Sequence, residues 1–400
     1  MKYIKNLYQE AKRRDLYPDI PVVNDIAYPE LTLAPDKKFL CFCSNNYLGL
    51  SVHPEVKKAA IEAVKTYGIG TCESRLVAGN LHVIEELEQA ISDFKNTEDA
   101  LVFLSGFMAN IGAIPAIMDS YRAYDLPKIE NDNNLIIKDI LAHTSIIDGC
   151  KLSQSNTKSY LHNDMEHLEK ILRRNKNKRK LIITDGVFSM DGDMAPLDKI
   201  VALAKKYNAM TMVDDAHATG VIGENGRGTP EHFGVEDEID IVMGTLSKAT
   251  GGLGGFITGP KEVIEMLKVR AHSYVFTSTL PPEQAVAMRT ALKIIEEQPE
   301  LRINLHKNVG LLRSGLKKMG YNILNSETQI IPIFIGNNKK SIKLSRQLYK
   351  HGILASAIRY PAVSADQSRI RLSVMATHTE TQIEKGLKIL EKCGKKVGII

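Results

Sequence analysis

Residues 239–255 constrain the fold of this chain more than any other stretch. The stretch begins as an apolar run rich in β-branched residues, which predicts a buried strand of a parallel sheet. It ends in small residues that surround one lysine, Lys248. A lysine amine in a tight, dry pocket has a lowered pKa and becomes nucleophilic, which suits a Schiff base with a carbonyl cofactor. The alternative from this stretch alone is a surface lysine in a glycine-rich loop.

The composition is that of an ordinary globular protein. The chain has 400 residues, 44% of them hydrophobic and 25% charged, which fits one large domain and one smaller one. Its net charge of +5 is mild, so it gives no argument for a nucleic-acid partner and is compatible with an anionic small-molecule substrate. The five cysteines have no C-x-x-C spacing, so we expect reduced, structural cysteines and no metal site.

The first 18 residues mix Lys, Arg, Asp and Glu, which is unlike a secretory signal or a transit peptide. No run approaches the roughly 20 apolar residues of a membrane span. We therefore expect a cytoplasmic protein without a membrane span.

Strand and helix patterns alternate through the first two thirds of the chain. Strands are predicted at 100–104, 136–141, 181–185, 210–214, 239–245 and 255–258, and helices at 53–67, 84–94, 106–118 and 197–207. This β-α-β repetition predicts an α/β fold with a mostly parallel sheet that is covered by helices on both faces.

Both ends of the chain have a different pattern. Residues 1–44 are predicted to be an N-terminal arm, with an amphipathic helix over 1–20 and short strands over 21–43. Pro281 and Pro282 mark a boundary between a large domain, 45–282, and a smaller α+β domain, 283–400. The smaller domain is predicted to contain a helical stretch, 283–319, broken near Pro299, strands at 330–335, 353–358 and 369–374, and helices at 341–351 and from 379. Residues 119–134 are predicted to form an exposed excursion.

Asp214 ends a predicted strand, at the edge where α/β folds bind their ligands. A carboxylate buried there needs a cationic partner, and a protonated pyridine nitrogen would be one. His217 follows three residues later and could reach a phenolic oxygen. The alternatives are a helix cap for Asp214 and a hydrogen-bonded core histidine for His217.

Other candidate residues also lie where strands give way to loops or helices. Ser105, Gly106 and Phe107 open a predicted helix, whose backbone N–H groups and dipole favour a phosphate. His143 and Ser189 each follow a predicted strand, and the imidazole could lie flat on an aromatic cofactor. Taken singly, each could be an ordinary polar loop residue. A dinucleotide site is not favoured, because the glycine runs at 220–223 and 251–255 lack the G-x-G-x-x-G spacing.

Four motifs together resemble those of the α-oxoamine synthases, pyridoxal-phosphate enzymes of the aspartate-aminotransferase fold. They are Ser-Asn-Asn-Tyr-Leu-Gly-Leu from residue 44, Asp-Gly-Val-Phe-Ser-Met-Asp-Gly from 185, Val-Asp-Asp-Ala-His-Ala-Thr-Gly from 213 and Gly-Thr-Leu-Ser-Lys from 244. The resemblance covers about residues 1–400, with the motifs in the family's order. It implies a type I fold, with a large sheet domain and a smaller C-terminal domain.

The resemblance implies a role for each matching position. Lys248 would hold pyridoxal phosphate and act as general acid and base, Asp214 would pair with the ring nitrogen, and His143 would stack on the ring. Ser189 and His217 would bind the phenolic oxygen. The phosphate would be bound by Ser105, Gly106, Phe107 and Thr245, and by Thr277 and Ser278 of the neighbouring subunit. Arg371 would bind the substrate carboxylate, and Asn45 would line the same pocket.

The implied reaction condenses a small amino acid with an acyl-CoA, or an acyl carrier protein thioester, and releases CoA and CO2. The implied assembly is a homodimer whose two subunits share each site. Ser74-Arg75 favours alanine or serine over glycine, and hence an 8-amino-7-oxononanoate synthase-like or serine palmitoyltransferase-like enzyme. Glycine C-acetyltransferase is the alternative within the family. A plain aminotransferase and a non-catalytic partner subunit are the alternatives outside this reaction, and Lys248 argues against the last.

Overall fold

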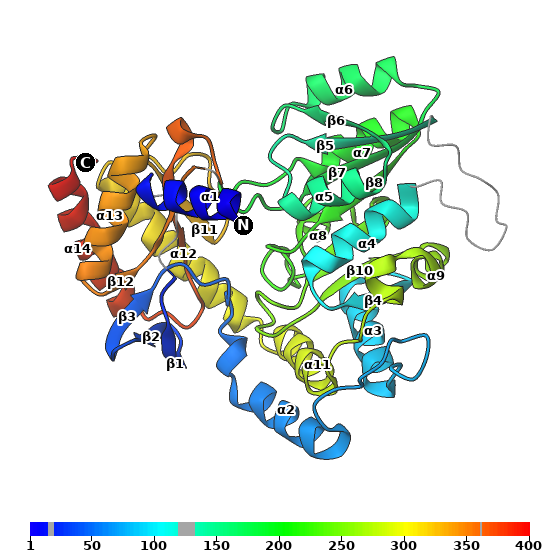
Figure 1. The fold of residues 1–400 in the computed structure, drawn as a ribbon, viewed down its shortest axis with the longest axis horizontal. Helices are drawn as coiled ribbons and strands as arrows, with labels where there is room; N and C mark the ends of the chain where they lie inside the picture. The colour runs from blue at the N-terminus through cyan, green and yellow to red at the C-terminus, as the bar shows by residue number, and fades with distance from the viewer. Residues whose placement is uncertain (15–19, 119–132, 361) are drawn as a thin grey trace. The chain divides into compact units, whose positions relative to one another are not determined.

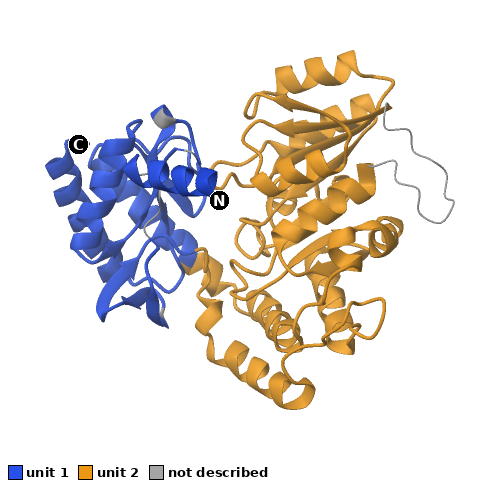
Figure 2. Cartoon of the chain, viewed as in Figure 1, with its two compact units in different colours: residues 1–44, 190–192, 305–400 blue, residues 45–189, 193–304 orange. Residues whose placement is uncertain are grey.

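The computed structural model describes residues 1–14, 20–118, 133–360 and 362–400. Contacts divide the chain into two compact units, coloured in Figure 2. The larger unit comprises residues 45–189 and 193–304, and the smaller comprises 1–44, 190–192 and 305–400. The predicted excursion at 119–134 lies outside the described residues, except for its last two positions. The domain limits at 44/45 and 282/283 stay a prediction.

A seven-stranded sheet forms the centre of the larger unit (Figure 1). Its strands lie in the order β4 (Asp99–Phe103), β10 (Gly255–Gly259), β9 (Ile241–Thr245), β8 (Ala209–Asp214), β7 (Arg179–Asp185), β5 (Asn134–Asp139) and β6 (Asn156–Tyr160). β10 is antiparallel to both of its neighbours, and the pairs from β9 to β6 are parallel. The predicted mostly parallel sheet is confirmed.

Successive residues of the central strands enter opposite hydrophobic cores. In β7, Leu181 and Ile183 pack in one core, while Ile182 packs in the other. Because side chains alternate across a strand, a sheet with helices on both faces needs apolar residues at consecutive positions. This requirement explains the unbroken apolar runs in the sequence.

Helices cover the two faces of this sheet separately. The core on one face includes residues of α4 (Gly106–Met118), α5 (Thr144–Leu152) and α9 (Lys261–Arg270). The core on the other face includes residues of α6 (Met165–Arg174) and α7 (Leu197–Tyr207). A further layer packs α11 (Pro282–Glu297) on α2 (Pro54–Tyr67) and α3 (His82–Lys95). Two short helices, α8 (Thr229–His232) and α10 (His272–Val275), complete this unit.

The smaller unit contains two small sheets and the helices α1 (Lys2–Arg13), α13 (Asn338–Lys350) and α14 (Glu380–Val397). The first sheet has the order β1 (Val23–Ala27), β2 (Glu30–Leu33), β3 (Lys37–Cys41) and β12 (Ile353–Leu354). The second has the order β11 (Ile330–Phe334), β14 (Arg369–Ser373) and β13 (Ser356–Ile358). Helix α12 (Glu300–Lys318) begins in the larger unit and continues in the smaller. None of the helices in the described ranges is long and apolar enough to cross a membrane.

The structure corrects the sequence reading in several details. Strand β5 ends at Asp139, two residues before the predicted end, and the predicted strand 353–358 is split into β12 and β13. The sequence reading missed β6, because four of its five residues are exposed on an edge strand and carry no apolar alternation. The predicted break near Pro299 is confirmed between α11 and α12.

A buried histidine makes the stability of the smaller unit sensitive to acid. The ring of His378 stacks on Phe42 with a centroid separation of 4.8 Å, and its Nδ1 accepts the Met375 N–H at 3.0 Å. Its side chain is 4% exposed, and burial lowers its pKa from 6.5 to about 4. The folded state therefore strongly favours the neutral ring.

We predict that His378 reduces the stability of the wild type as the pH falls from 6.5 to 4. Above pH 6.5 both folded and unfolded states hold the ring neutral, and below it the unfolded state takes up the proton first. The contribution lost by pH 4 is about 3 kcal/mol. His378→Asn, whose amide oxygen can replace Nδ1 as acceptor, should lack this loss in urea unfolding at both pH values. An equal acid dependence in the two proteins would contradict the assignment.

Candidate active site

The carboxyl ends of the parallel strands form one edge of the large sheet, and polar residues gather there. β5 ends at Asp139, β7 at Asp185, β8 at Asp214 and β9 at Thr245. Asp185 and Asp214 are register partners across β7 and β8. The segments that follow these strands carry His143, Ser189, His217 and Lys248. The topology thus brings together residues that lie far apart in the sequence.

Asp214 is a buried carboxylate with two hydrogen-bond donors. It is 4% exposed, accepts Asn110 Nδ2 at 2.8 Å on Oδ2 and accepts the Ala216 N–H at 3.1 Å on Oδ1. Asn110 lies in α4 and also donates to Ser145 Oγ at 2.8 Å. The sequence reading missed Asn110. Its position one helical turn after Gly106, on the helix predicted to bind phosphate, was the available signal.

His143 is the N-cap of α5, and this position fixes the backbone from which its ring extends. Its Nδ1 lies 2.7 Å from Ser145 Oγ, and its N–H donates to Asp185 Oδ2 at 3.0 Å. Burial lowers the pKa of His143, the charge of Asp214 opposes this shift and the charge of Lys248 adds to it. His143 is therefore held toward its neutral form, beside both the buried carboxylate and the lysine.

Asp185 lies in the same field. Burial and the neighbouring charge of Asp214 raise its pKa well above the ordinary value, while the His143 N–H and the charge of Lys248 oppose the shift. Two carboxylates side by side in a dry site cannot both ionise easily. A cation at this edge of the sheet would therefore stabilise the ionised forms of two acidic groups, Asp185 and Asp214.

The start of α4 forms a small cradle. Ser105 Oγ accepts the Met108 N–H at 3.2 Å, so Ser105 caps the start of this helix. A Cβ on Gly255 would lie 2.3 Å from Gly106 N, so a side chain there would close this approach. A Cβ on Gly106 would lie 3.2 Å from Thr245 Cβ. The helix start and the end of β9 thus meet at close range.

Lys248 lies in a tight turn after β9. Its carbonyl accepts the Gly251 N–H at 3.0 Å, and Gly251 has a φ of +82°. A Cβ on Gly251 would also lie 2.3 Å from Ser51 N, so this turn requires glycine. The Lys248 side chain is half-buried, and its charge acts on His143 and Asp185.

His217 and Asn45 belong to one hydrogen-bonded chain. Tyr47 Oη lies 2.7 Å from His217 Nδ1 and donates to Asn45 Oδ1 at 3.1 Å. His217 and Tyr47 are 7% and 0% exposed. Tyr47 was quoted in a motif but given no role from the sequence, and the structure places it between two predicted site residues.

The remaining predicted residues are placed less closely. Ser189 and Thr277 are half-buried, and Ser278 is exposed. Within the described residues, no hydrogen bond joins Thr277 or Ser278 to the other candidates. Arg371 lies in β14 of the smaller unit and is 8% exposed. The pKa of the Cys43 thiol is lowered by its hydrogen bond to Cys41 and, to a smaller extent, by its hydrogen bond to Ser356. The charge of Arg371 lowers it further. Arg369, on the same strand, is taken up by an ion pair with Asp191.

Comparison with known proteins adds to this geometry. Residues 37–390 match the family described as aminotransferase class I and II. The whole chain is 42% identical over 402 residues to 8-amino-7-oxononanoate synthase of Thermoanaerobacter pseudethanolicus, covering 98% of that protein. It is 45% identical over 365 residues to the Lysinibacillus sphaericus enzyme of the same name, with 91% of each covered. The chain belongs to this family as an α-oxoamine synthase.

Solved structures of other family members superimpose well on this α-oxoamine synthase. Serine palmitoyltransferase of S. paucimobilis, with a bound PLP–myriocin aldimine, has a TM-score of 0.93 and 32% identity, and the match covers 100% of this chain and 99% of that one. An 8-amino-7-oxononanoate synthase of Francisella tularensis has a TM-score of 0.76 and 28% identity, over 90% and 99% of the two chains. The type I fold predicted from the motifs is confirmed.

Pyridoxal phosphate is the family's cofactor, and the residues described here fit it. The helix start at Gly106 suits a phosphate, because the first backbone N–H groups of a helix have no intrahelical partners and face that end. The buried Asp214, next to a raised-pKa Asp185, suits a protonated ring nitrogen.

We predict that Asn110→Ala destabilises the cofactor-free protein by about 2 kcal/mol, because the buried Asp214 carboxylate loses a donor. Urea unfolding measures the loss. Ser145→Ala is the control, since it removes the other partner of Asn110 and leaves the contact with Asp214 intact. A stability of Asn110→Ala equal to that of the wild type would show that the Asp214 contact contributes little.

Proposed function

We propose that this α-oxoamine synthase is an 8-amino-7-oxononanoate synthase. The observation that carries the proposal is the full-length identity of 40–45% to proteins of that name from several bacteria. Asp214, which ends β8, and Lys248, His143 and His217, which follow the strands at the same edge of the sheet, support the proposal.

The product's carbon skeleton identifies the two substrates. A decarboxylative condensation adds the amino acid's α-carbon, amino group and side chain to the acyl carbon of a thioester. The methyl and amino-bearing carbons of 8-amino-7-oxononanoate then come from alanine. The remaining seven carbons, with a carboxylate at the far end, come from a seven-carbon dicarboxylic acyl thioester. The products balance as the amino ketone, CO2 and the free thiol.

A condensation of serine with a long-chain acyl thioester is the second candidate. It is supported by the TM-score of 0.93 to serine palmitoyltransferase at 32% identity, against 0.76 for the 8-amino-7-oxononanoate synthase. Ser74-Arg75 does not separate the two. Arg75 forms two hydrogen bonds to Glu88, at 2.7 and 2.8 Å, which leaves its guanidinium committed to a protein carboxylate.

We predict that alanine with the seven-carbon dicarboxylic acyl-CoA gives the highest kcat/KM of a small substrate grid. The grid crosses glycine, alanine and serine with acetyl-CoA, palmitoyl-CoA and the dicarboxylic acyl-CoA, and mass spectrometry of the amino ketone is the measurement. The acyl carrier protein thioester of the same acid is run beside the CoA thioester. Preference for serine and palmitoyl-CoA would support the second candidate. Amino-group transfer without release of thiol would contradict both.

The chain's own residues divide the chemistry. Bound pyridoxal phosphate supplies an electron sink for negative charge at the amino acid's α-carbon. Lys248 holds the cofactor and then moves the proton at that carbon. Asp214, fixed by Asn110 and the Ala216 N–H, pairs with the ring nitrogen and keeps it protonated. His143 covers one face of the ring as a neutral imidazole.

The remaining site residues bind and orient. Ser105, Gly106, Phe107 and Thr245 hold the phosphate. Ser189 and His217 bind the phenolic oxygen, and Tyr47 orients His217 through the 2.7 Å contact to its Nδ1. Asn45 and Arg371 bind the amino-acid substrate. A cytoplasmic location fits an enzyme that uses CoA or carrier-protein thioesters.

We predict that Arg371→Ala raises the amino-acid dissociation constant roughly 30-fold or more. A carboxylate in a partly dry cleft loses a charge-assisted, two-pronged partner. Spectral titration of the bound cofactor with alanine measures it, and Arg371→Lys should restore only part of the affinity. Arg369→Ala is the control: its ion pair with Asp191 makes it a stability residue, so alanine affinity should stay near the wild-type value. The reverse pattern would assign substrate binding to Arg369.

We also propose a homodimer in which Thr277 and Ser278 complete the neighbouring subunit's phosphate site. Thr277 is half-buried and Ser278 is exposed, and within the described residues no hydrogen bond joins either of them to the other candidates. Inactive Lys248→Ala subunits, mixed with inactive subunits carrying Thr277→Ala and Ser278→Ala, should recover part of the activity, because one of the two mixed sites is intact. Purified mixed dimers without activity would show that each subunit builds its site alone.

A further inference from the structure

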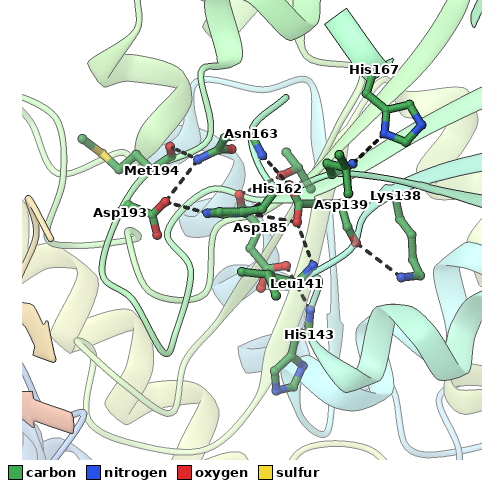
Figure 3. A network of polar contacts seen from close by, with 12 residues as sticks. Lys138, Asp139, Leu141, His143, His162, Asn163, His167, Asp185, Asp193 and Met194 are labelled. Atoms are coloured by element: carbon green, nitrogen blue, oxygen red, sulfur yellow. Dashed lines mark hydrogen bonds and ion pairs between the residues drawn. The ribbon is translucent and has the colours of Figure 1, made fainter. Parts of the chain in front are cut away.

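A chain of polar contacts lies beside the predicted cofactor residues and links three neighbouring strands (Figure 3). Asp139 ends β5, Asp185 ends β7, and His162 follows β6 by two residues. None of these three residues has a role in the proposed reaction. Two are carboxylates that are 0% and 4% exposed, which is costly unless something stabilises them.

His162 bridges the carboxylates of Asp139 and Asp193. Its Nδ1 lies 3.2 and 3.3 Å from the two oxygens of Asp139, and its Nε2 lies 2.8 Å from Asp193 Oδ2. Burial alone would lower the pKa of His162, but the hydrogen bonds to Asp139 and Asp193 raise it to about 10. At neutral pH the ring is therefore a cation with an N–H for each carboxylate.

On one side, the bridge leads to His143. Asp139 Oδ1 accepts the Leu141 N–H at 2.7 Å, and Asp139 Oδ2 accepts the Asn163 N–H at 3.0 Å. Two residues beyond Leu141, the N–H of His143 donates to Asp185 Oδ2 at 3.0 Å. The segment from Asp139 to His143 is thus held at both ends by carboxylates, and Figure 3 shows these contacts in sequence.

On the other side, the bridge leads to Ser189. The backbone carbonyl of Asp193 accepts the Phe188 N–H at 3.0 Å, and Val187 pairs with Met194. The buried Phe188 ring meets the His162 ring edge to face, with a centroid separation of 4.4 Å. Phe188 precedes Ser189 directly, so its placement sets where the Ser189 side chain begins.

We propose that His162 is a positioning residue that sets the spacing between His143 and Ser189 by holding the Asp139–His143 and Gly186–Ser189 segments together. The proposal rests on the proposed pyridoxal-phosphate site, in which one segment covers the ring face and the other reaches the phenolic oxygen. Other charged groups also face this site: Lys138 Nζ donates to the Asp139 carbonyl at 3.3 Å, and Asp185 carries a raised pKa. His162 and its neighbour Asn163 both contact Asp139, which begins one segment, and Asp193, whose carbonyl accepts the Phe188 N–H of the other. His162 is the charged member of this pair.

The cationic ring is suited to this task for a geometric reason. An imidazolium has two N–H groups pointing in opposite directions on a rigid plane, so it can pin two carboxylates at a fixed separation. A glutamine amide reaches only one of them well. The proposed test is therefore His162→Gln, which is neutral, together with Asp193→Asn, which keeps His162 and its contact with Asp139.

His167→Gln is the matched control. His167 lies five residues after His162, and its Nδ1 accepts the Leu161 N–H at 3.1 Å, a contact that involves neither Asp139 nor Asp193. Hydrogen exchange of the cofactor-free proteins is measured at the amides of Leu141, His143 and Phe188. His162→Gln should speed exchange at all three about tenfold or more, Asp193→Asn at Phe188 only, and His167→Gln at none of them.

The same variants are then loaded with pyridoxal phosphate. His162→Gln should bind it about tenfold more weakly and lose much of the visible circular dichroism of the bound cofactor, because the two segments no longer fix its surroundings. His167→Gln should match the wild type. Faster exchange spread evenly over the whole chain, with unchanged dichroism per bound cofactor, would reduce His162 to a general stabilising residue and overturn the proposal.

The experiment separates this inference from the proposed function. Wild-type protein that binds no pyridoxal phosphate would contradict the proposed function, and the exchange rates of the cofactor-free proteins would still decide whether His162 joins the two segments. Wild-type loading and activity, with unchanged exchange in His162→Gln, would leave the function in place and reject the bridge. If His162→Gln fails to fold, Asp193→Asn gives the same decision at Phe188.

Discussion

Asp214, a buried acidic residue at the carboxyl edge of the large sheet, is the constraint on which the rest of the proposed site depends. Asp214 is 4% exposed and accepts hydrogen bonds from two neutral donors, Asn110 Nδ2 and the Ala216 N–H. A buried charge is costly without an opposite charge nearby. The neighbouring carboxyl group of Asp185 has a raised pKa, so it is held toward its neutral form. This arrangement supports the proposal that a protonated ring nitrogen pairs with Asp214. The contacts with Asn110 and the Ala216 N–H hold the two side-chain oxygens in place.

The sheet topology explains why such a site can be built from distant residues. Parallel strands place their carboxyl ends at one edge, so β5, β7, β8 and β9 each deliver one functional segment to it. The antiparallel strand β10 adds a different element, since Gly255 at its start lets the backbone approach Gly106 at the start of α4. Apolar residues on both faces of the strands make this edge rigid, because each strand is packed in two cores.

Much of this arrangement was predictable from the sequence, and the parts that were not have physical reasons. Lys248, Asp214 and His143 follow apolar strands, so periodicity alone located them near one edge. Asn110 was not found, because its position one turn after Gly106 does not reveal its partner, and the contact with Asp214 joins residues far apart in the sequence. His162 was missed with β6, an exposed edge strand whose sequence lacks apolar alternation. In general, the sequence did not reveal contacts between residues that lie far apart along the chain.

The two arginines of β14, Arg369 and Arg371, are alike in the sequence pattern but differ in a contact that only the structure shows. Arg369 and Arg371 are two residues apart, and the strand is paired regularly on both sides, so both lie on the same face. Charge and strand position are therefore equal for the two. The difference is Asp191, which forms an ion pair with Arg369 and commits that guanidinium to the protein. A carboxylate substrate would have to displace a buried ion pair to use Arg369, at the cost of leaving Asp191 uncompensated. The ion pair with Asp191 thus argues against Arg369 as the substrate arginine and supports the proposal for Arg371.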